Sequence, residues 1–510
     1  MHKKDKNKNS KRNTIKSKQT SEKLKFDRTL SKVIVGVVIL AVVLLVYAIV
    51  GFGALPLRYR VIASLLLVLL AVVLGRWLVK SRRNTSKIVS LVIVVALLFG
   101  VTQVSVLRNF IGRVTGSSTE HNLVHVVVME ASPHESMRDF KDLNPSFGST
   151  SLADSNFINQ AQEEIKTKDK IEFNAVSFTD YIEMNDALYD GSLDALIISE
   201  GHGAFIEEIK ENFSEETRII ATYSYEKEVE LPPREVDVSS ETFSIFITGI
   251  DTYGKLSSVS RSDVNMVLTV NPTTHQILLT SIPRDYHVTL HSFGVKDKLT
   301  HAGIYGVMES VKTLEDLLSS QAGEKIDIDY YLRVNFTSVV DIVNALGGVS
   351  VNSIYSFRAG GHTFNKGMND INGAQALSFV RERYSLRGGD FDRIKNQQAL
   401  ISGIIDKATS PTIITRYNKF LSSVAGSFEL SMPEKEFNKV VNDQISSMKG
   451  WEIISIQLGA TGAHSKTTYS MPGWNLYVAE PKYETVKSAA EMILKMESGL
   501  KVSKETDWPH

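Results

Sequence analysis

The stretch Phe243-Ser-Ile-Phe-Ile-Thr-Gly-Ile250, followed at once by Asp251, decides the fold around which this chain is built. It is apolar and rich in β-branched and aromatic residues, as are residues 264–270 and 276–282. Asn271-Pro272 marks a turn between the second and third runs. Runs of this length and type, bounded by such turn residues, are typical of strands. We therefore predict three consecutive antiparallel strands.

Four charged residues stand at the ends of these strands: Asp251, Arg261, Asp263 and Arg284. In an antiparallel meander the first strand ends where the second begins, and the third returns to that edge, so the four should lie together. Carboxylate oxygens suit Mg²⁺, and the planar guanidinium group suits the oxygens of a phosphate-type anion. The alternative is a set of surface ion pairs, which are common at strand ends and contribute little.

The N-terminal region predicts a membrane anchor. Apolar stretches cover residues 33–50, 61–74 with their flanks, and 88–106, each close to the roughly 20 residues that cross a bilayer. The first 28 residues hold eleven Lys and Arg against three acidic residues. The loop between the second and third stretches is also basic, which places it and the N-terminus in the cytoplasm. We therefore expect a multi-pass protein of the cell membrane whose large C-terminal region is extracytoplasmic.

The basic tail is low in apolar residues, and we expect it to be disordered. Its charges could contact anionic lipid or nucleic acid, but a role in fixing the topology at the inner leaflet is the favoured interpretation. The chain has no cysteine, so the extracytoplasmic part must depend on its hydrophobic cores rather than on disulfides. We predict this domain order: 1–28 basic cytoplasmic tail, 29–110 three transmembrane helices, 121–229 acidic α/β domain, 230–240 linker, 241–500 main domain and 501–510 tail.

Strand-like and helix-like segments alternate in residues 121–229, which predicts a small α/β domain. Acidic residues far outnumber basic ones there, so this region should not bind a nucleic-acid backbone. His202, in Glu200-Gly-His-Gly203, is interpreted as a turn residue rather than a ligand. In the main domain, residues 296–306 are expected to form a polar loop and residues 307–319 a helix.

A second group of polar residues surrounds Gly388-Gly389. Arg381 and Arg383 precede the pair in a segment that, if extended, turns both guanidinium groups to one side. Asp390, Arg393 and Gln397 follow it on one face of a helix that runs to about residue 408. A role as a helix cap would explain Asp390 by itself, but it would not explain why Arg381, Arg383, Arg393 and Gln397 lie so close to the Gly-Gly pair.

Several ordered motifs resemble the LytR-CpsA-Psr (LCP) family over roughly residues 241–500. The three spans and the acidic region look most like the streptococcal CpsA type, whose additional domain is called the accessory domain. The motifs are Thr248-Gly-Ile-Asp-Thr252, Arg261-Ser-Asp263, Ser281-Ile-Pro-Arg-Asp285, Val334-Asn-Phe336, Leu346-Gly-Gly-Val349, Val380-Arg-Glu-Arg383 and Gly389-Asp-Phe-Asp-Arg393 with Gln397-Gln398.

The resemblance implies a central, mainly antiparallel sheet flanked by helices. It also implies a phosphotransferase that moves a glycopolymer from a polyprenyl pyrophosphate carrier to peptidoglycan, with capsular polysaccharide as the expected polymer. The expected partners are this lipid-linked polysaccharide, peptidoglycan, membrane lipid and capsule-assembly proteins, but not nucleic acid. The alternatives are a regulator of capsule synthesis or transcription acting through the cytoplasmic tail, a non-catalytic binder of the lipid-linked polymer, and a pyrophosphate hydrolase.

The same resemblance assigns roles to residues. Asp251 and Asp263 would hold Mg²⁺ or Mn²⁺, and Arg284, Asp285 and Asp390 would be catalytic, the two carboxylates orienting arginines or assisting the incoming hydroxyl. The motif departs from the family pattern at Thr300-His-Ala302 and at Glu382. The residues expected to bind pyrophosphate are Arg261, Arg284, Arg381, Arg383, Arg393 and Gln397.

Overall fold

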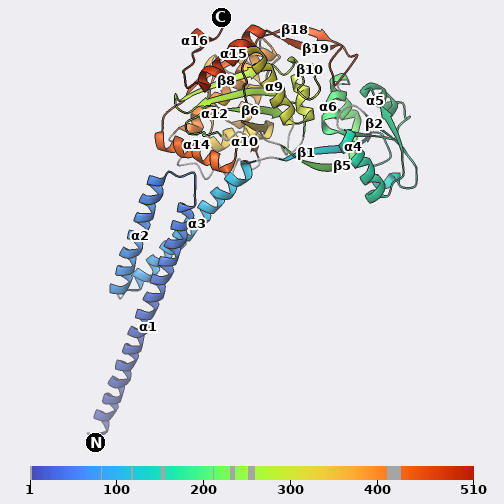
Figure 1. Ribbon diagram of the computed structural model, residues 1–510. Helices are drawn as coiled ribbons and strands as arrows, with labels where there is room; N and C mark the ends of the chain where they lie inside the picture. Colours follow the sequence, from blue (N-terminus) through green and yellow to red (C-terminus); the bar gives the residue numbers. More distant parts are fainter. Residues whose placement is uncertain are drawn as a thin grey trace. The chain divides into compact units, whose positions relative to one another are not determined.

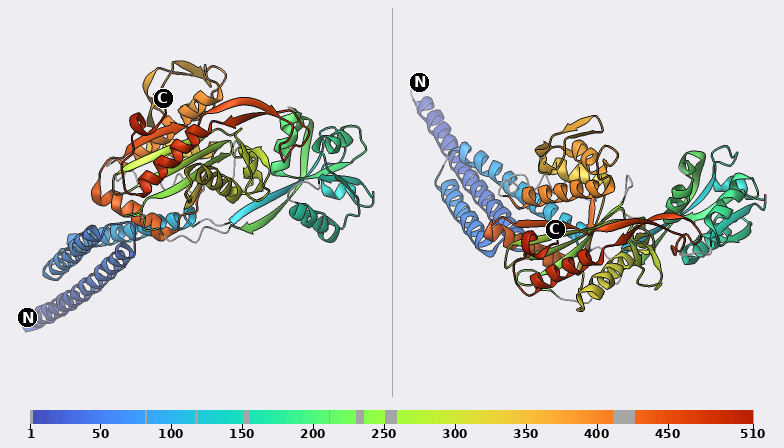
Figure 2. Two further views of the ribbon diagram at one scale, coloured as in Figure 1. Left: turned by 45° about the horizontal axis from the view of Figure 1, so that its top comes forward. Right: turned by 90° about the horizontal axis from the view of Figure 1, so that it is seen from above.

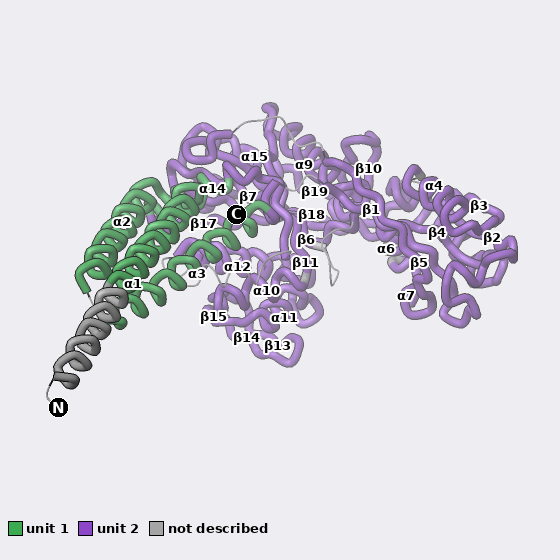
Figure 3. Tube along the Cα trace, turned by 90° about the horizontal axis from the view of Figure 1, so that it is seen from below, with its two compact units in different colours: residues 1–112, 437–447 green, residues 113–436, 448–510 purple. Residues whose placement is uncertain are grey.

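The computed structural model describes residues 3–81, 83–116, 119–150, 155–210, 212–229, 236–250, 259–410 and 427–509. The chain divides into two compact units, one formed by residues 1–112 and 437–447 and the other by residues 113–436 and 448–510 (Figure 3). Asp251 lies outside the described residues, so its predicted role stays a prediction.

The first unit contains three helices long and apolar enough to cross a membrane: α1 (Lys3–Val50), α2 (Leu57–Lys80) and α3 (Asn84–Val114). Buried side chains such as Val38, Leu78 and Leu97 pack these helices together. Helix α1 begins at Lys3, and the expectation of a disordered tail stays a prediction. Lys and Gln are good helix formers, and a helix propagates easily from an existing apolar span.

The second unit begins with a five-stranded sheet in the order β3-β2-β4-β1-β5. Strand β2 was not predicted, since Ser-Phe-Gly-Ser-Thr lacks an apolar run. The prediction of a turn at His202 was also wrong, because this residue lies in the first turn of α6 and is fully buried. The elements are β1 (Thr119–Met129), β2 (Ser146–Thr150), β3 (Asn174–Phe178), β4 (Ala195–Ser199), β5 (Thr217–Glu228), α4 (Ser155–Glu164), α5 (Tyr181–Tyr189), α6 (Glu200–Ile209) and α7 (Phe213–Glu216).

The larger sheet has six strands in the order β16-β11-β6-β7-β8-β17. The predicted meander is confirmed, because β6 pairs with β7 and β7 with β8 in antiparallel fashion. Three of the five neighbouring pairs are antiparallel, whereas β11 joins β6 and β17 joins β8 in parallel. The strands are β6 (Phe243–Ile250), β7 (Val264–Asn271), β8 (Gln276–Ile282), β11 (Tyr330–Asn335), β16 (Phe428–Leu430) and β17 (Glu452–Gln457).

Helices pack against this sheet from both faces, as expected for an α/β domain (Figure 1). Side chains alternate between the two faces of the sheet along β6, which explains this arrangement. Phe246 packs on one face with residues of α9 (Val307–Ala322) and α15 (Tyr483–Glu497). Ile247 packs on the other face, in a cluster that includes Ile401 of α12. The helices of the α12 side are α10 (Phe336–Leu346), α11 (Gly373–Arg381) and α12 (Asp390–Thr409).

Short strand pairs complete the unit, and one of them joins the two sheets. Met471 and Leu476, at the far end of the β18–β19 hairpin, lie in the same buried cluster as Phe205 of α6 (Figure 2). The predicted polar loop at residues 296–306 is instead buried and partly regular. The remaining elements are β9 (His287–Thr289), β10 (Lys296–Lys298), α8 (Leu299–Ala302), β12 (Val349–Ser353), β13 (Phe357–Ala359), β14 (His362–Phe364), β15 (Gly367–Ile371), α14 (Glu434–Ser447), β18 (Ala460–Ser465), β19 (Leu476–Pro481) and α16 (Lys504–Asp507).

Candidate active site

The edge of the large sheet fixes the first group of charged residues. Asp263 immediately precedes β7, and its backbone N–H donates to the carbonyl of Gly249 at 2.9 Å. Gly249 must stay small, since a Cβ there would lie 2.8 Å from the side chain of Val264. Arg284 and Asp285 lie in the turn that directly follows β8, at the same edge of the sheet. The antiparallel geometry therefore brings these carboxylates and this guanidinium group together, as predicted.

Arg284 is the centre of the group. Its Nη1 donates to Asp263 Oδ1 at 2.6 Å, and its Nε lies 3.7 Å from Asp285 Oδ2. Burial works against the charged guanidinium, but the carboxylates of Asp263, Asp285 and Asp390 outweigh it and raise the pKa of Arg284. Arg284 is therefore a permanent, oriented cation.

The second group is placed by the start of α12. Gly389 precedes the helix with φ 54°, a left-handed conformation that favours glycine. Further along the helix, Gln398 donates to Ser281 Oγ at 2.8 Å and to the Ile456 carbonyl at 2.6 Å. These bonds fasten α12 to β8 and β17, so its first turn lies close to the residues that follow β8. The helix geometry thus explains how residues about 110 positions apart in the sequence become neighbours.

Asp390 and Arg393 form an ion pair across this first turn. Burial lowers the pKa of Arg393, and the nearby cations Arg284 and Arg383 act in the same direction. The carboxylates of Asp390 and Asp263 oppose them. The electrostatic neighbours of Arg393 therefore come from both groups, so the two predicted constellations form one site.

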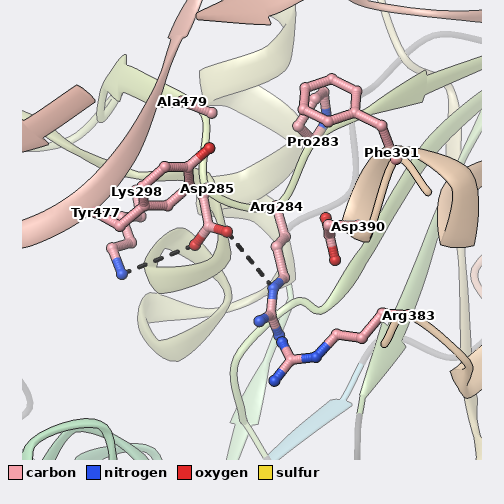
Figure 4. A pocket seen from close by; sticks show the side chains of 10 residues that line it. Pro283, Arg284, Asp285, Lys298, Arg383, Asp390, Phe391, Tyr477 and Ala479 are labelled. Carbon is pink, nitrogen blue, oxygen red and sulfur yellow. Dashed lines mark ion pairs between the residues drawn. The ribbon is translucent and has the colours of Figure 1, made fainter. Parts of the chain in front are cut away.

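A cavity of about 410 Å³ opens at this place (Figure 4). Arg284 is drawn there with Asp285 on one side and Asp390 on the other. Five of its ten lining residues are charged, as expected for an anion-binding site rather than an apolar slot. Its lining residues are Pro283, Arg284, Asp285, Lys298, Arg383, Gly388, Asp390, Phe391, Tyr477 and Ala479.

At this site, the buried Nε groups of Arg284 and Arg393 have no hydrogen-bond acceptor among the described residues. An unsatisfied buried donor costs about 1–3 kcal/mol. The oxygens of a bound anion, or water, would relieve this cost. The chemistry of the site therefore fits an anionic ligand rich in oxygen, such as a phosphate or pyrophosphate.

Some predicted residues lie away from the cavity. Arg381 is the last residue of α11 and is exposed, so the prediction that it alternates with Arg383 along an extended segment was wrong. The helix simply continues one residue further than expected. Arg261 and Gln397 are half-buried and do not line the cavity. Glu382, where the motif departs from the family pattern, accepts a hydrogen bond from the Ser385 backbone at 2.7 Å.

Sequence reasoning assigned no role to Lys298, Phe391 or Tyr477, which also line the cavity. Lys298 Nζ lies 3.7 Å from Asp285 Oδ1, and the side chain is only 4% exposed. A single lysine in a segment interpreted as a polar loop gives little signal in the sequence. Tyr477 gives no signal in the sequence, since it belongs to β19, which is distant in the chain from the other residues of the cavity.

A buried carboxylate–histidine pair supports Lys298. The adjacent Asp297 is hydrogen-bonded through Oδ1 to His301 Nδ1 at 2.7 Å, and both side chains are fully buried. Its other oxygen, Oδ2, accepts from the Ser470 backbone N–H at 2.9 Å. Burial opposes the charged carboxylate, but His301 and Ser470 outweigh it and lower the pKa of Asp297. This arrangement fixes the backbone from which Lys298 extends.

A divalent cation was expected at Asp251 and Asp263. Among the residues that the structure describes, no group of three or more His, Asp or Glu side chains is arranged to hold a metal. Asp263 supplies the oxygen donors that Mg²⁺ prefers, and its side chain is 13% exposed, so it remains accessible while paired with Arg284. The donor type therefore fits, with Asp263 as the described ligand.

Fold and site together define an α/β domain with an arginine-rich anion site, in a chain with three helices able to span a membrane. A model described as the LytR_cpsA_psr family matches residues 208–489, more than half of the chain. The chain belongs to this family.

The chain is similar to several known proteins. The polyisoprenyl-teichoic acid–peptidoglycan teichoic acid transferase TagU of Enterococcus faecalis is 33% identical over 227 residues, which cover 44% of this chain and 72% of TagU. The protein of the same name from Bacillus anthracis is 34% identical over 218 residues, covering 42% and 69%. The crystal structure of B. subtilis TagU is similar at 26% identity, with a TM-score of 0.40, over 52% of this chain and 100% of that one.

Proposed function

We propose that this chain is a phosphotransferase that moves a glycopolymer from a polyprenyl pyrophosphate carrier to peptidoglycan. The observation that carries the proposal is Arg284, held by Asp263 at 2.6 Å beside a cavity that Arg383 and Lys298 also line. Phosphoryl transfer depends on positioning and charge neutralisation more than on covalent chemistry by the protein. An oriented set of cations around one cavity supplies both.

In the proposed step, an acceptor hydroxyl oxygen forms a bond to the phosphorus that carries the glycopolymer. The bond from that phosphorus to the bridging oxygen breaks, and polyprenyl phosphate leaves with the bonding electrons. The hydroxyl proton passes to a carboxylate, for which Asp390 and Asp285 are the candidates at the cavity. Arg284, Arg383 and Arg393 stabilise the charge that develops on the oxygens.

Mg²⁺ bound through Asp263, and through Asp251 as predicted, would neutralise charge on the pyrophosphate. Asp263 already orients Arg284, so one carboxylate would serve both the ion and the arginine.

We further propose capsular polysaccharide as the polymer and the outer face of the cell membrane as the location. The basic residues of the tail and of the loop between α2 and α3 support the orientation. The capsular assignment rests on the layout: three spans and the sheet of β1 to β5, most of which precedes residue 208, where the family match begins. The relatives above are named for teichoic acid, which is the competing polymer.

The experiment is single-turnover transfer by the full-length protein in lipid nanodiscs. The donors are lipid-pyrophosphate-linked capsular oligosaccharide and the corresponding teichoic-acid lipid, with peptidoglycan fragments as the acceptor, with and without Mg²⁺. Metal-dependent product that contains both glycan and acceptor, and that Arg284→Ala abolishes, is expected. Binding of the lipid without any product would identify a non-catalytic binder, and release of glycan phosphate without acceptor would identify a hydrolase.

A further inference from the structure

Exposed aromatic side chains are few in the second unit, and they are not scattered at random. Among the described residues after residue 114, three aromatic side chains are exposed: Tyr384, Tyr477 and Tyr483. Tyr477 lines the cavity, and Tyr384 follows the cavity-lining Arg383 in the chain. An exposed apolar surface at a binding cavity indicates contact with a ligand more strongly than one elsewhere on the surface.

The ring of Tyr477 packs against residues of the neighbouring strand β18. A Cβ on Gly462 of the paired strand β18 would lie 3.2 Å from the Tyr477 ring, so the ring packs closely over this glycine. The His464 ring meets it edge-on, with the centroids 5.9 Å apart. The preceding residue, Leu476, is buried in the hydrophobic cluster of the small sheet. The ring is therefore positioned in advance of any ligand, while 45% of the residue remains exposed.

Polar groups surround this aromatic surface. Burial, together with the carboxylates of Asp285 and Asp390, raises the pKa of the Tyr477 phenol, and all three residues line the same cavity. Lys298 lines the same cavity (Figure 4). An aromatic face bordered by carboxylates and an ammonium group matches a ligand that has a face of C–H groups and a rim of hydroxyls. A polyprenyl tail has no hydroxyls and could not exchange hydrogen bonds with these polar groups.

We propose that Tyr477 forms a saccharide platform, to which the exposed Tyr384 next to the cavity-lining Arg383 also belongs: a pyranose ring stacks on Tyr477 while its hydroxyls bond to Asp285, Asp390 and Lys298. The aromatic face is electron-rich and attracts the slightly positive C–H groups of the sugar. The proposal rests on the proposed function, because the sugar is placed next to the anion site. The cavity volume of about 410 Å³ lies within the range of about 300–1,000 Å³ for small-molecule sites.

Tyr384 extends this platform beyond the cavity. The guanidinium group of Arg383 lies 4.6 Å from the centre of the Tyr384 ring, and its Nη2 donates to the Tyr384 hydroxyl at 2.5 Å. The residue is still 86% exposed, so one face of the ring is open. The contact couples the aromatic side chain to Arg383, which lines the cavity, and in the proposal Tyr384 takes a second sugar unit.

The test compares two lipids on the full-length protein in nanodiscs: polyprenyl pyrophosphate without sugar and the same lipid carrying an oligosaccharide. Tyr477→Ala should weaken binding of the sugar-bearing lipid by about three- to tenfold and leave binding of the sugar-free lipid unchanged. Tyr477→Phe keeps the stacking surface and should stay within about twofold of the wild type. Tyr384→Ala should show a smaller loss, and Tyr483→Ala is the matched control, an exposed tyrosine that does not line the cavity.

Two sources of sugar are distinguished by the kinetics. If the loss appears as a higher KM for peptidoglycan fragments while donor binding is unchanged, the platform holds the acceptor sugar. Sugar-dependent binding that needs Tyr477, in a protein that forms no product, would support the platform and refute the proposed transfer. Wild-type donor binding and wild-type acceptor KM in the folded double variant of Tyr477→Ala and Tyr384→Ala would overturn the platform, whatever the outcome for transfer.

Discussion

Replacing Arg284 by alanine tests the central assignment. The change removes a cation that donates to Asp263 at 2.6 Å and lies 3.7 Å from Asp285. It deletes a donor aimed at the cavity and leaves two carboxylates whose repulsion of an incoming phosphate is no longer offset. Removing one oriented donor to a developing oxyanion costs about 2.7–4 kcal/mol. We therefore expect Arg284→Ala to lower kcat by about 10²- to 10³-fold.

Arg284→Lys separates charge from geometry. Lysine keeps the cation but lacks the planar fork that lets arginine contact Asp263 and a phosphate oxygen together. It should therefore recover part of the lost rate but not all of it. The assay is single-turnover formation of the glycan–peptidoglycan product at saturating donor, with thermal melting to confirm folding.

Arg358→Ala is the matched control, since this exposed arginine of β13 lies outside the cavity. It should keep wild-type turnover. If Arg284→Ala is folded and retains more than about a tenth of the wild-type kcat, the reasoning that places Arg284 at the reacting phosphate is refuted.

Other consequences concern stability and the cavity wall. Glu120→Gln breaks the buried pair with Arg333 and should destabilise the fold by about 3–5 kcal/mol in chemical unfolding. Glu429→Gln should lower the free energy of unfolding by under about 1 kcal/mol, because burial disfavours the charged form of Glu429 and raises its pKa. An equal loss of stability for Glu120→Gln and Glu429→Gln would contradict this reasoning. Burial lowers the pKa of His202 to about 4, so the unfolded state binds more protons below pH 6.5. Stability should therefore fall by at most about 3 kcal/mol as the pH drops from 6.5 towards 4, and His202→Leu should remove this pH dependence of the melting temperature. Lys298→Met should reduce turnover about tenfold without lowering the melting temperature; unchanged turnover would exclude Lys298 from the site.

The sequence predicted the parts of the site that depend on local periodicity. Strand ends follow from apolar runs and turn residues, so the pattern of residues was enough to place Asp263, Arg284 and Asp285 at one edge of the sheet. The helix after Gly389 was predicted for the same reason. What brings the two groups together, the bonds from Gln398 to β8 and β17, is a tertiary contact with no local signature.

The errors also have physical causes. Arg381 was misplaced because the end of a helix shifts by a residue without changing the pattern of apolar positions. Residues 296–306 look polar, yet Lys298 and His301 are buried, because their partners Asp285 and Asp297 compensate the charge. Tyr477 could not be found, since a strand's neighbours in space are set by topology and not by its own residues.

The hairpin that ends near Tyr477 has a consequence for the order in which the protein can fold. The core that contains Phe205 is completed by Met471 and Leu476, which the ribosome adds about 270 residues later. At about 5–20 residues per second, that delay is roughly 13–54 s. During this time the part of this core that Met471 and Leu476 cover stays exposed. The sheet that is synthesised first is therefore among the last parts of the molecule to become stable, and a chain that stops before residue 471 leaves it unfinished.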